Sequence, residues 1–416
     1  MSAEARPYVM EPTRETGTSE PRAWTGPERF AFRAAIAYFG VFFLGSLLDS
    51  APGPRRLLAA ASSPVGWFGH TAMRLGGSPN DGGAQWAIAQ QIVAVLVALA
   101  IAAVWSLASR RREYRRPYGW FRIALRYYVA IIMLVYGGFK VIESQFPPLT
   151  IDQLVQPLGN LAPMGLLWSF MGYSAVYASF TGLGETIGAL LLFFRRTTTA
   201  GALILVAVLS NVALLNYTFD VPVKQLSSNL LLAAMVLALP DLRRLLDVFV
   251  LNRPTEPVDL TFDIPRWLCR VRRFLKPVVI VVATSGPLVF SFFVHRRMHE
   301  RPALFGFYEV AEFVRDGTPV APILAEPERW RSVVFGRPGA VSIRFMSDRI
   351  RVLDATVDTV AHRLTLSPRD NSRISGVLAY EQLPDSGLRI LGKLVAYSVD
   401  VTLRRIDERT VFRLLR

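Results

Sequence analysis

Glu185 is the residue of this sequence best placed to do chemistry, because it is a lone carboxylate in an apolar stretch. It stands in Gly182-Leu183-Gly184-Glu185-Thr186-Ile187-Gly188, nine residues before Phe194. In a helix this spacing is about 13–14 Å of rise, which places the carboxylate near the middle of a bilayer. A charge at that depth is costly unless it is neutralised or paired, so such residues are often functional. Two interpretations follow: a proton- or ligand-handling group, or a hydrogen-bonded residue that fixes helix packing.

A second group of polar residues flanks Glu185 in the chain. Lys140 ends an apolar stretch as Gly138-Phe139-Lys140, and Gln145 follows it. The other members are Asn211, Asn216, Asp220 and Lys224. One interpretation is an outward-facing polar cavity that holds a quinone head group or a small anion; no catalytic residue is identified. In the other, Lys140 is an anchor at the membrane surface, and Asp220 with Lys224 is an i,i+4 pair at a helix start.

The cysteine and the histidines predict no metal site and no evident cofactor. Cys269 is the single cysteine, so an internal disulfide, a CxxC pair and a cysteine metal cage are excluded. The four histidines, His70, His295, His299 and His362, lack the spacing of metal-binding motifs. His295 and His299 stand among arginines, which favours a place at a membrane surface.

Composition indicates a membrane protein. The chain of 416 residues is 52% apolar and 19% charged, with a mean hydropathy of +0.32. Soluble domains carry about 25% charged residues, so the deficit indicates a lipid-facing surface and a lipid bilayer as the surroundings. The net charge is +15, but the basic residues cluster beside apolar stretches. That pattern is typical of membrane proteins and argues against nucleic acid as a partner.

Seven stretches predict membrane helices, each near the roughly 20 apolar residues that span a bilayer. They lie at 33–48, 86–109, 120–141, within 166–194, within 199–217, at 222–239 and at 277–294, the last with a kink at Gly286-Pro287. The polar first 30 residues predict a disordered tail without a cleavable signal peptide. The predicted division is a tail (1–30), two helices with an outer loop (31–118), a four-helix unit (119–250), a linker with the seventh helix (251–298) and a soluble domain (299–416).

Basic residues also predict the orientation of these helices. Five arginines lie between 110 and 116, Arg195-Arg196 forms a tight basic turn, and eight Lys or Arg lie between 243 and 276, whereas 142–164 has none. Because cytoplasmic loops are enriched in Lys and Arg, we expect a cytoplasmic N-terminus and a periplasmic C-terminal domain, in a bacterial inner membrane. The loop at 49–85, with Arg55, Arg56 and Arg74, is expected to include an amphipathic segment on the outer face.

The sequence after residue 303 predicts an all-β domain. Val395, Tyr397, Val399, Val401 and Leu403 alternate with polar residues, as on a half-buried strand. Further short strands are predicted at 340–346, 350–353, 363–366, 376–380 and 388–394, with turns at 367–371 and 383–387. This pattern favours an antiparallel sandwich or small barrel of roughly 110 residues. The last five residues, 412–416, continue the strand-like pattern.

Residues 120–241 resemble the four-helix unit of the DoxX-like membrane family. The resemblance rests on Gly138-Phe139-Lys140 and on the Gly-x-x-Glu-x-x-Gly core around Glu185, and it covers less than a third of the chain. It implies a four-helix membrane fold with Lys140 and Glu185 at the matching positions. Some members are membrane subunits of thiosulfate:quinone oxidoreductase, and others are linked to redox or thiol stress. The extra helices and the C-terminal domain depart from the minimal family.

Two functions compete on these observations. The first is a membrane scaffold, binding or assembly component whose β domain recruits an envelope protein partner, which fits the missing catalytic constellation. The alternative is the membrane subunit of a quinone-linked oxidoreductase, with Lys140 and Glu185 in its site. A transporter is the third, but the inverted repeats that would support it are not found.

Overall fold

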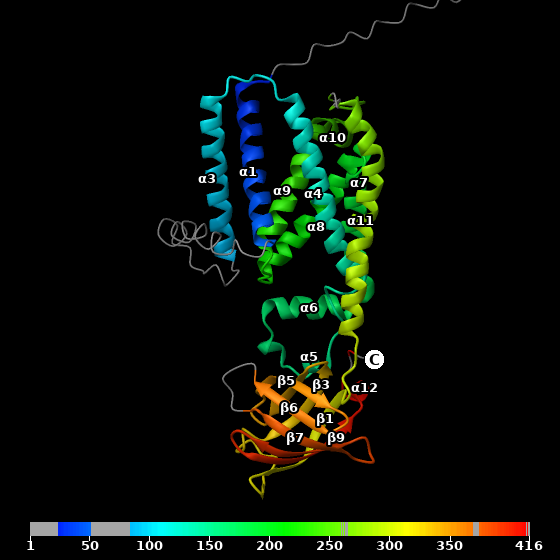
Figure 1. Ribbon diagram of the computed structural model, residues 1–416. Coiled ribbons are helices and arrows are strands. Elements are labelled where there is room, and N and C mark those ends of the chain that lie inside the picture. The colour runs from blue at the N-terminus through cyan, green and yellow to red at the C-terminus, as the bar shows by residue number, and fades with distance from the viewer. Residues whose placement is uncertain are drawn as a thin grey trace, which may run out of the picture. The chain divides into compact units, whose positions relative to one another are not determined.

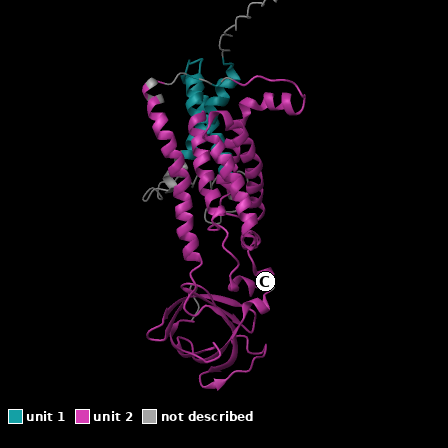
Figure 2. Ribbon diagram, turned by 90° about the vertical axis from the view of Figure 1, so that its right-hand side faces the viewer, with its two compact units in different colours: residues 1–74, 88–121, 260–263 teal, residues 75–87, 122–259, 264–416 magenta. Residues whose placement is uncertain are grey.

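The computed structural model describes residues 24–50, 84–258, 260, 262, 265–368, 374–412 and 414. The chain divides into two compact units, which are described separately: Met1–Arg74, Ile88–Phe121 and Leu260–Asp263 form one, and Leu75–Ala87, Arg122–Asp259 and Ile264–Arg416 form the other (Figure 2). The predicted tail up to residue 23 lies outside the described residues, as does most of the predicted outer loop with His70, Arg55, Arg56 and Arg74.

The first helix begins earlier than predicted. α1 (Gly26–Ser50) includes the end of the predicted tail, because Thr25 and Glu28 form a reciprocal cap. The Thr25 N–H donates to the Glu28 carboxylate at 2.8 Å, and the Glu28 N–H donates to the Thr25 hydroxyl at 3.4 Å. Such a capping box satisfies two of the free N–H groups at a helix start.

Aromatic rings and one buried arginine hold the first unit together. It contains α1, most of α3 (Ala84–Ala108) and the first residues of α4 (Arg115–Val141). The Arg33 guanidinium donates to the Tyr114 hydroxyl from Nε at 3.0 Å and from Nη2 at 2.6 Å. Trp24, Phe32 and Tyr118 surround this contact, with ring centroids 5.4–5.8 Å apart.

The α-helices of the second unit that precede its strands include the rest of α4, α5 (Ile151–Leu154), α6 (Pro163–Tyr173), α7 (Ala175–Leu192), α8 (Thr198–Thr218), α9 (Lys224–Ala238), α10 (Leu242–Phe249) and α11 (Arg266–Met298) (Figure 1). Among the described residues of the whole chain, five stretches are long and apolar enough to cross a membrane: Ala87–Ala108, Arg115–Val141, Ala175–Leu192, Arg195–Thr218 and Arg270–Met298. These correspond to the second, third, fourth, fifth and seventh predicted helices. α9, at 15 residues, is shorter than the roughly 20 that a span needs.

The fourth predicted helix is two helices. The stretch at 166–194 contains most of α6 and all of α7, and the break falls at Ser174, whose hydroxyl accepts a hydrogen bond from the Tyr177 N–H at 3.2 Å. Serine is a preferred N-cap because its hydroxyl satisfies a free N–H of the first turn. Figure 1 shows α6 lying across the direction of α7 and α8. α11 also differs from its prediction, since it begins at Arg266 and continues through both Pro277 and Pro287.

The predicted β domain is a closed antiparallel barrel rather than a sandwich. Its strands are β1 (Gly306–Arg315), β2 (Thr318–Pro319), β3 (Trp330–Arg337), β4 (Ala340–Phe345), β5 (Ile350–Asp358), β6 (Arg363–Pro368), β7 (Gly376–Gln382), β8 (Leu388–Leu394) and β9 (Ser398–Ile406). Neighbours in the chain pair from β3 to β9, and β1 pairs with both β3 and β9, so eight strands close the ring and β2 extends β1. Closure leaves these eight strands without a free edge.

The alternation predicted for the last strand is confirmed from residue 399 on. Val399, Val401 and Leu403 lie in the buried barrel core, whereas Val395 is exposed in the turn before β9. β1 and β3 were not predicted. β1 contains a register shift between Val310 and Glu312, which interrupts the period of two. After β9, Glu408–Val411 forms the short helix α12, and most of the strand-like stretch at 412–416 lies outside the described residues.

β3 was not predicted from the sequence because other residues of the protein cover both of its faces. Val333 and Phe335 belong to the barrel core, while Val334 lies in a separate buried cluster with Ile151 and Val155 from α5 and its end. A strand buried on both faces reads as a continuous apolar run instead of an alternating one. The segment between α4 and α6 therefore packs on the outside of the barrel.

Candidate functional site

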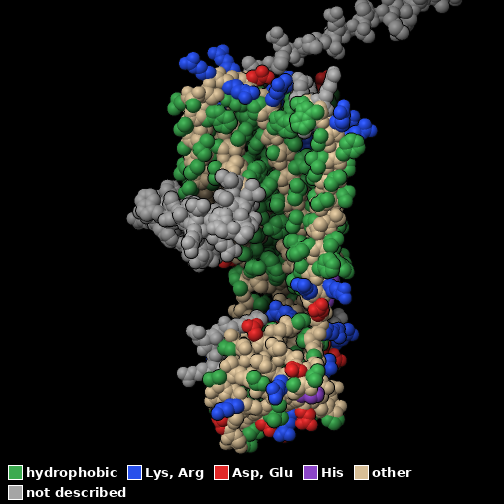
Figure 3. All heavy atoms as spheres, viewed as in Figure 1, with side chains coloured by type: hydrophobic (Ala, Val, Ile, Leu, Met, Phe, Trp, Pro, Cys, Tyr) green, Lys and Arg blue, Asp and Glu red, His purple; other side chains and the backbone are tan. Residues whose placement is uncertain are grey.

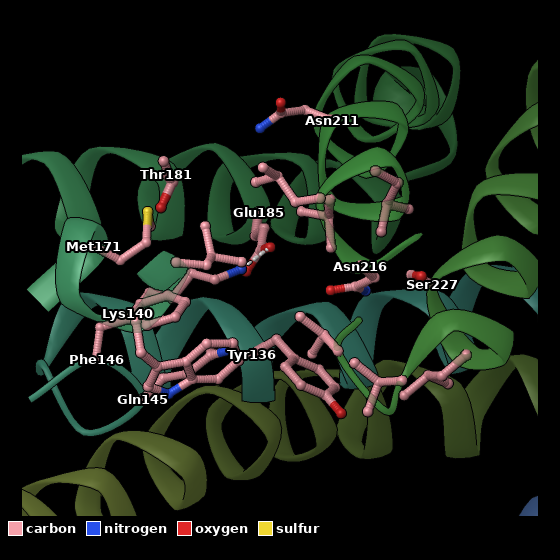
Figure 4. Close-up of a pocket in the computed structure, with 18 of the residues that line it drawn as sticks. Tyr136, Lys140, Gln145, Phe146, Met171, Thr181, Glu185, Asn211, Asn216 and Ser227 are labelled. Atoms are coloured by element: carbon pink, nitrogen blue, oxygen red, sulfur yellow. Dashed lines mark hydrogen bonds and ion pairs between the residues drawn. The ribbon is translucent and has the colours of Figure 1, made fainter. Parts of the chain in front are cut away.

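A cavity of about 340 Å³ lies within the second unit, lined by α4, α6, α7, α8 and α9 and by the segments next to them. Its wall is mainly apolar and aromatic, with Met133, Phe146, Trp168, Met171 and Leu230 among its residues. Five of the seven predicted site residues line it: Lys140, Gln145, Glu185, Asn211 and Asn216 (Figure 4). A largely apolar cavity with a few polar groups is the usual form of a small-molecule site.

An ion pair between Lys140 and Glu185 stands on the cavity wall. The Lys140 ammonium donates to Glu185 Oε1, and only 5% of Lys140 and 1% of Glu185 are exposed. This placement differs from the interpretation of Lys140 as an anchor at the membrane surface. The pair neutralises two charges that would each be costly alone in a buried place.

Two glycines explain how α4 and α7 come close enough to form this pair. A Cβ on Gly182 would lie 2.7 Å from Lys140 Cβ and 2.8 Å from the Gly137 carbonyl oxygen. A Cβ on Gly137 would lie 2.4 Å from Thr186 Oγ1. Any larger residue therefore separates the helices, as expected for a contact between small residues. Gly182, one of the glycines noted around Glu185 in the sequence, thus sets with Gly137 the distance between the two charged residues.

Three polar atoms on the wall lack a hydrogen-bond partner among the described residues. They are Glu185 Oε2, Gln145 Oε1 and Asn216 Nδ2. Asn216 is 6% exposed, and Figure 4 shows its side chain beside the Lys140–Glu185 pair. A buried polar atom without a partner costs about 1–3 kcal/mol, which a ligand with matching groups would remove. The wall therefore offers two hydrogen-bond acceptors and one donor.

Asp220 and Lys224 form their predicted ion pair, but away from the cavity wall and in a different geometry. Lys224 Nζ lies 2.7 Å from Asp220 Oδ1 and 3.1 Å from the Val221 carbonyl oxygen. α9 begins only at Lys224, and Asp220 precedes it with a φ of 54°, so the pair does not lie within the first turn of a helix. The ammonium is buried and the carboxylate is 57% exposed, which makes the pair a link from the core to the surface.

The predicted polar residues differ in how exposed their side chains are. Asn211 is exposed, and Figure 4 places it apart from Lys140, Glu185 and Asn216. Phe170 of α6 and Tyr177 of α7 are also exposed, and their rings pack with centroids 5.5 Å apart. These three residues line the cavity and form its rim.

The sequence missed several wall residues that a helical spacing could have indicated. Tyr136 lies four residues before Lys140, and Thr181 lies four residues before Glu185, so each shares a helix face with a predicted residue. Trp168 and Ser227 also line the cavity. Trp168 packs against Phe146 at a centroid distance of 5.1 Å, which ties α6 to the segment after α4. That contact joins residues 22 positions apart, so no local sequence pattern predicts it.

The segment between α4 and α6 reaches from the cavity to the barrel. Gln145 and Phe146 line the cavity, while Asp152 accepts a hydrogen bond from Arg337 of β3 at 2.7 Å. Asp152 is 9% exposed, and a Cβ on Gly336 would meet its Oδ1 at 2.6 Å. The barrel thus fixes one end of the segment whose other end closes the cavity.

The remaining predicted residues lie elsewhere. His295 and His299 stack near the end of α11 with ring centroids 4.0 Å apart, and His362 lies in the turn before β6. Arg195 and Arg196 form the tight turn between α7 and α8, as predicted. Cys269 falls within α11, and its side chain lies outside the description. Within the described residues, no group of three or more His, Cys, Asp or Glu is placed to hold a metal ion.

Comparison with known proteins relates part of the chain to a bacterial relative. No protein-family model matches the chain, and no solved structure matches it. Over 134 residues, which are 32% of this chain, the sequence is 35% identical to the uncharacterized protein YwoB of Bacillus subtilis (strain 168), and the match spans 82% of that relative. Over these residues, the chain belongs to the family that includes YwoB.

Proposed function

We propose that the chain is an integral membrane binding or assembly component, whose four-helix unit at 119–250 holds a small, largely apolar ligand. The observation that carries the proposal is the cavity of about 340 Å³ with the Lys140–Glu185 pair on its wall. A buried ion pair stabilises a protein little compared with apolar packing of the same volume. Its place beside unpartnered polar atoms supports a role in ligand binding.

The surface of the helices supports the membrane part of this proposal. The five long apolar helices expose large side chains, among them Leu107, Phe180 and Phe274. Figure 3 shows apolar side chains over the visible face of the helices, with Lys and Arg near the helix ends. Exposed apolar surface of this extent is unfavourable in water and favourable in lipid. Because loops rich in Lys and Arg tend to lie in the cytoplasm, we place the chain in a bacterial inner membrane, with its N-terminus in the cytoplasm and the barrel in the periplasm.

The contact between Lys140 and Glu185 also supports membership of the DoxX-like family. These are the two charged residues of the motifs that carry the resemblance, and they form one ion pair on one cavity wall. The resemblance also supports the second candidate function, a membrane subunit of a quinone-linked oxidoreductase. The observation that favours it is the apolar cavity itself, in which the Asn216 amide could donate to a quinone carbonyl.

Native mass spectrometry of the full chain in mild detergent tests the binding proposal. We expect a co-purified small molecule in the wild type that is lost in Glu185→Gln. Glu309→Gln is the matched control, because Glu309 lies on the barrel and pairs with Arg404 at 3.2 Å, away from the cavity. A quinone as the lost molecule would favour the oxidoreductase subunit. Only bulk lipid, in equal amounts in all three proteins, would contradict the binding role.

The assembly part of the proposal concerns the barrel. We expect residues 303–416 to recruit an envelope protein partner, because the barrel is all-β and has its own buried core. Cross-linking in intact cells, followed by purification of the full chain, should give an adduct that maps to this region. Adducts confined to the helices would contradict this part while leaving the ligand site untouched.

A further inference from the structure

The charges and free polar atoms of the cavity restrict what can occupy it. Lys140 and Glu185 neutralise each other, so the wall favours an uncharged molecule over an ion. Glu185 Oε2 can accept a further hydrogen bond, and Asn216 Nδ2 can donate one. Both residues are more than nine-tenths buried, so an unmatched ligand leaves either atom without a partner. A head group that matches these two atoms presents one hydroxyl donor and one carbonyl acceptor, and Gln145 Oε1 can accept from a second donor.

The rim shows where such a molecule can enter. Asn211, Phe170 and Tyr177 are the exposed wall residues described above, on α8, α6 and α7. Next to them on α7, Phe180 and Leu183 expose apolar side chains. Asn211 is a polar side chain at residue 14 of the 21 in α8, well inside a stretch long and apolar enough to span a membrane. A polar amide facing lipid is costly at that depth unless it meets a polar group.

The geometry points to an uncharged amphipathic molecule, dissolved in the bilayer, that enters sideways between α7 and α8 and places a head group with a hydroxyl and a carbonyl in the cavity. This inference rests on the proposed ligand-binding function and names the ligand class and its route. Glu185 Oε2 accepts a hydrogen bond from the hydroxyl, and Asn216 Nδ2 donates one to the carbonyl. The apolar tail leaves past Phe170 and Tyr177 into the lipid. Asn211 offers the head group a polar contact as it passes the rim.

Three probes that share a dodecyl tail test the head group. Dodecyl para-hydroxybenzoate carries both groups, dodecyl benzoate lacks the hydroxyl, and para-dodecylphenol lacks the carbonyl. With the full chain in liposomes, affinities are compared as mole fractions in the bilayer, which removes differences in membrane partitioning. We expect the first probe to bind about tenfold or more tightly than either analogue, since each analogue leaves one buried atom unpaired. Equal affinities, or no binding of any probe, overturn the assignment.

Asn216→Leu separates the two hydrogen bonds without placing an unpaired charge in the protein. The leucine is similar in size, and it removes the amide that supplies the donor. The preference over para-dodecylphenol should then disappear, while the preference over dodecyl benzoate stays about tenfold. A variant that keeps both preferences shows that Asn216 does not contact the carbonyl and overturns that contact.

The sideways route is tested by the rate of binding. Asn211→Trp fills the rim, and Leu214→Trp adds the same bulk one helical turn away, at an exposed position that does not line the cavity. After stopped-flow mixing with probe-loaded liposomes, tryptophan fluorescence reports binding, because Trp168 lines the cavity. We expect Asn211→Trp to slow association about tenfold or more, with Leu214→Trp unchanged. Equal rates in the two variants overturn the route.

These outcomes are distinguishable from failure of the proposed function. If a co-purified molecule is lost in Glu185→Gln but no probe binds, the cavity is a binding site and the ligand class is wrong. If neither a co-purified molecule nor a probe binds, both proposals fail.

Discussion

Replacing Gly182 by alanine should separate α4 from α7 and weaken the Lys140–Glu185 pair. The added Cβ would lie 2.7 Å from Lys140 Cβ, 2.8 Å from the Gly137 carbonyl oxygen and 3.1 Å from the Val141 nitrogen. Carbon atoms in contact prefer about 3.5–4.0 Å, so the helices must move apart by roughly 1 Å. Both nearest atoms belong to the main chain or to a Cβ, so no flexible side chain can swing away. Overpacking of this kind costs about 1–3 kcal/mol of unfolding free energy.

Gly40→Ala is the matched control, because it makes the same change inside a helix without the steric contact. Gly40 lies in α1, and beyond its chain neighbours a Cβ there would meet no heavy atom within 4 Å. Alanine gains about 1 kcal/mol over glycine in helix propensity, and both variants share that gain. The difference between them therefore isolates the steric cost, expected at about 1–3 kcal/mol.

The assay is equilibrium unfolding of the full chain, in which mild detergent micelles are titrated with sodium dodecyl sulfate and helix content is followed by circular dichroism. A second readout is retention of the co-purified ligand, which Gly182→Ala should reduce and Gly40→Ala should leave intact. Equal unfolding free energies for the two variants would refute the close approach of α4 and α7, and with it the explanation of how the ion pair forms.

Three further predictions concern other contacts. Arg337→Met should lower the free energy of unfolding, measured by thermal unfolding, by about 1–3 kcal/mol, because it leaves the buried Asp152 carboxylate without its donor. The control Arg331→Met breaks an exposed ion pair on the same strand and should lower it by less than about 1 kcal/mol. Lys140→Met should destabilise by about 3–5 kcal/mol, and the double variant with Glu185→Gln should recover most of that loss in the same assay, because no buried charge remains. Arg389 donates two hydrogen bonds to Asp400, and this holds the pKa of that carboxyl below its ordinary value of 3.8. Since the folded-state pKa is the lower one, the stability it provides is complete above about pH 4 and is lost as the pH falls through the lowered value, so melting temperatures of Asp400→Asn should depend less on pH in that acid range than those of the wild type.

Local patterns of the sequence predict most of the elements of this protein. Apolar stretches near membrane-spanning length predicted the long helices, because each helix satisfies its own backbone hydrogen bonds and needs only its own residues to form. Alternation predicted six strands of the barrel, from β4 to β9, because most of those strands have one buried face and one more exposed face. In β4, where Ser342 is also buried, the alternation in the sequence comes from its polar side chain. Where an element is covered on both sides, as β3 is by α5, or carries a bulge, as β1 does, the local pattern is lost and the strand was missed.

The candidate site divides in the same way. The residue types alone singled out Glu185, Lys140 and Asn216, since polar groups are rare and costly in apolar helices. Their arrangement depended on contacts between residues far apart in the chain. Only the tertiary structure shows that Gly137 and Gly182 bring Lys140 to Glu185, across 45 positions. It also breaks the fourth predicted helix at Ser174, so that α6 borders a cavity, and it directs Asp220 and Lys224 away from that cavity. A sequence specifies which groups are costly to bury, but the packing of helices on one another decides which partners those groups find.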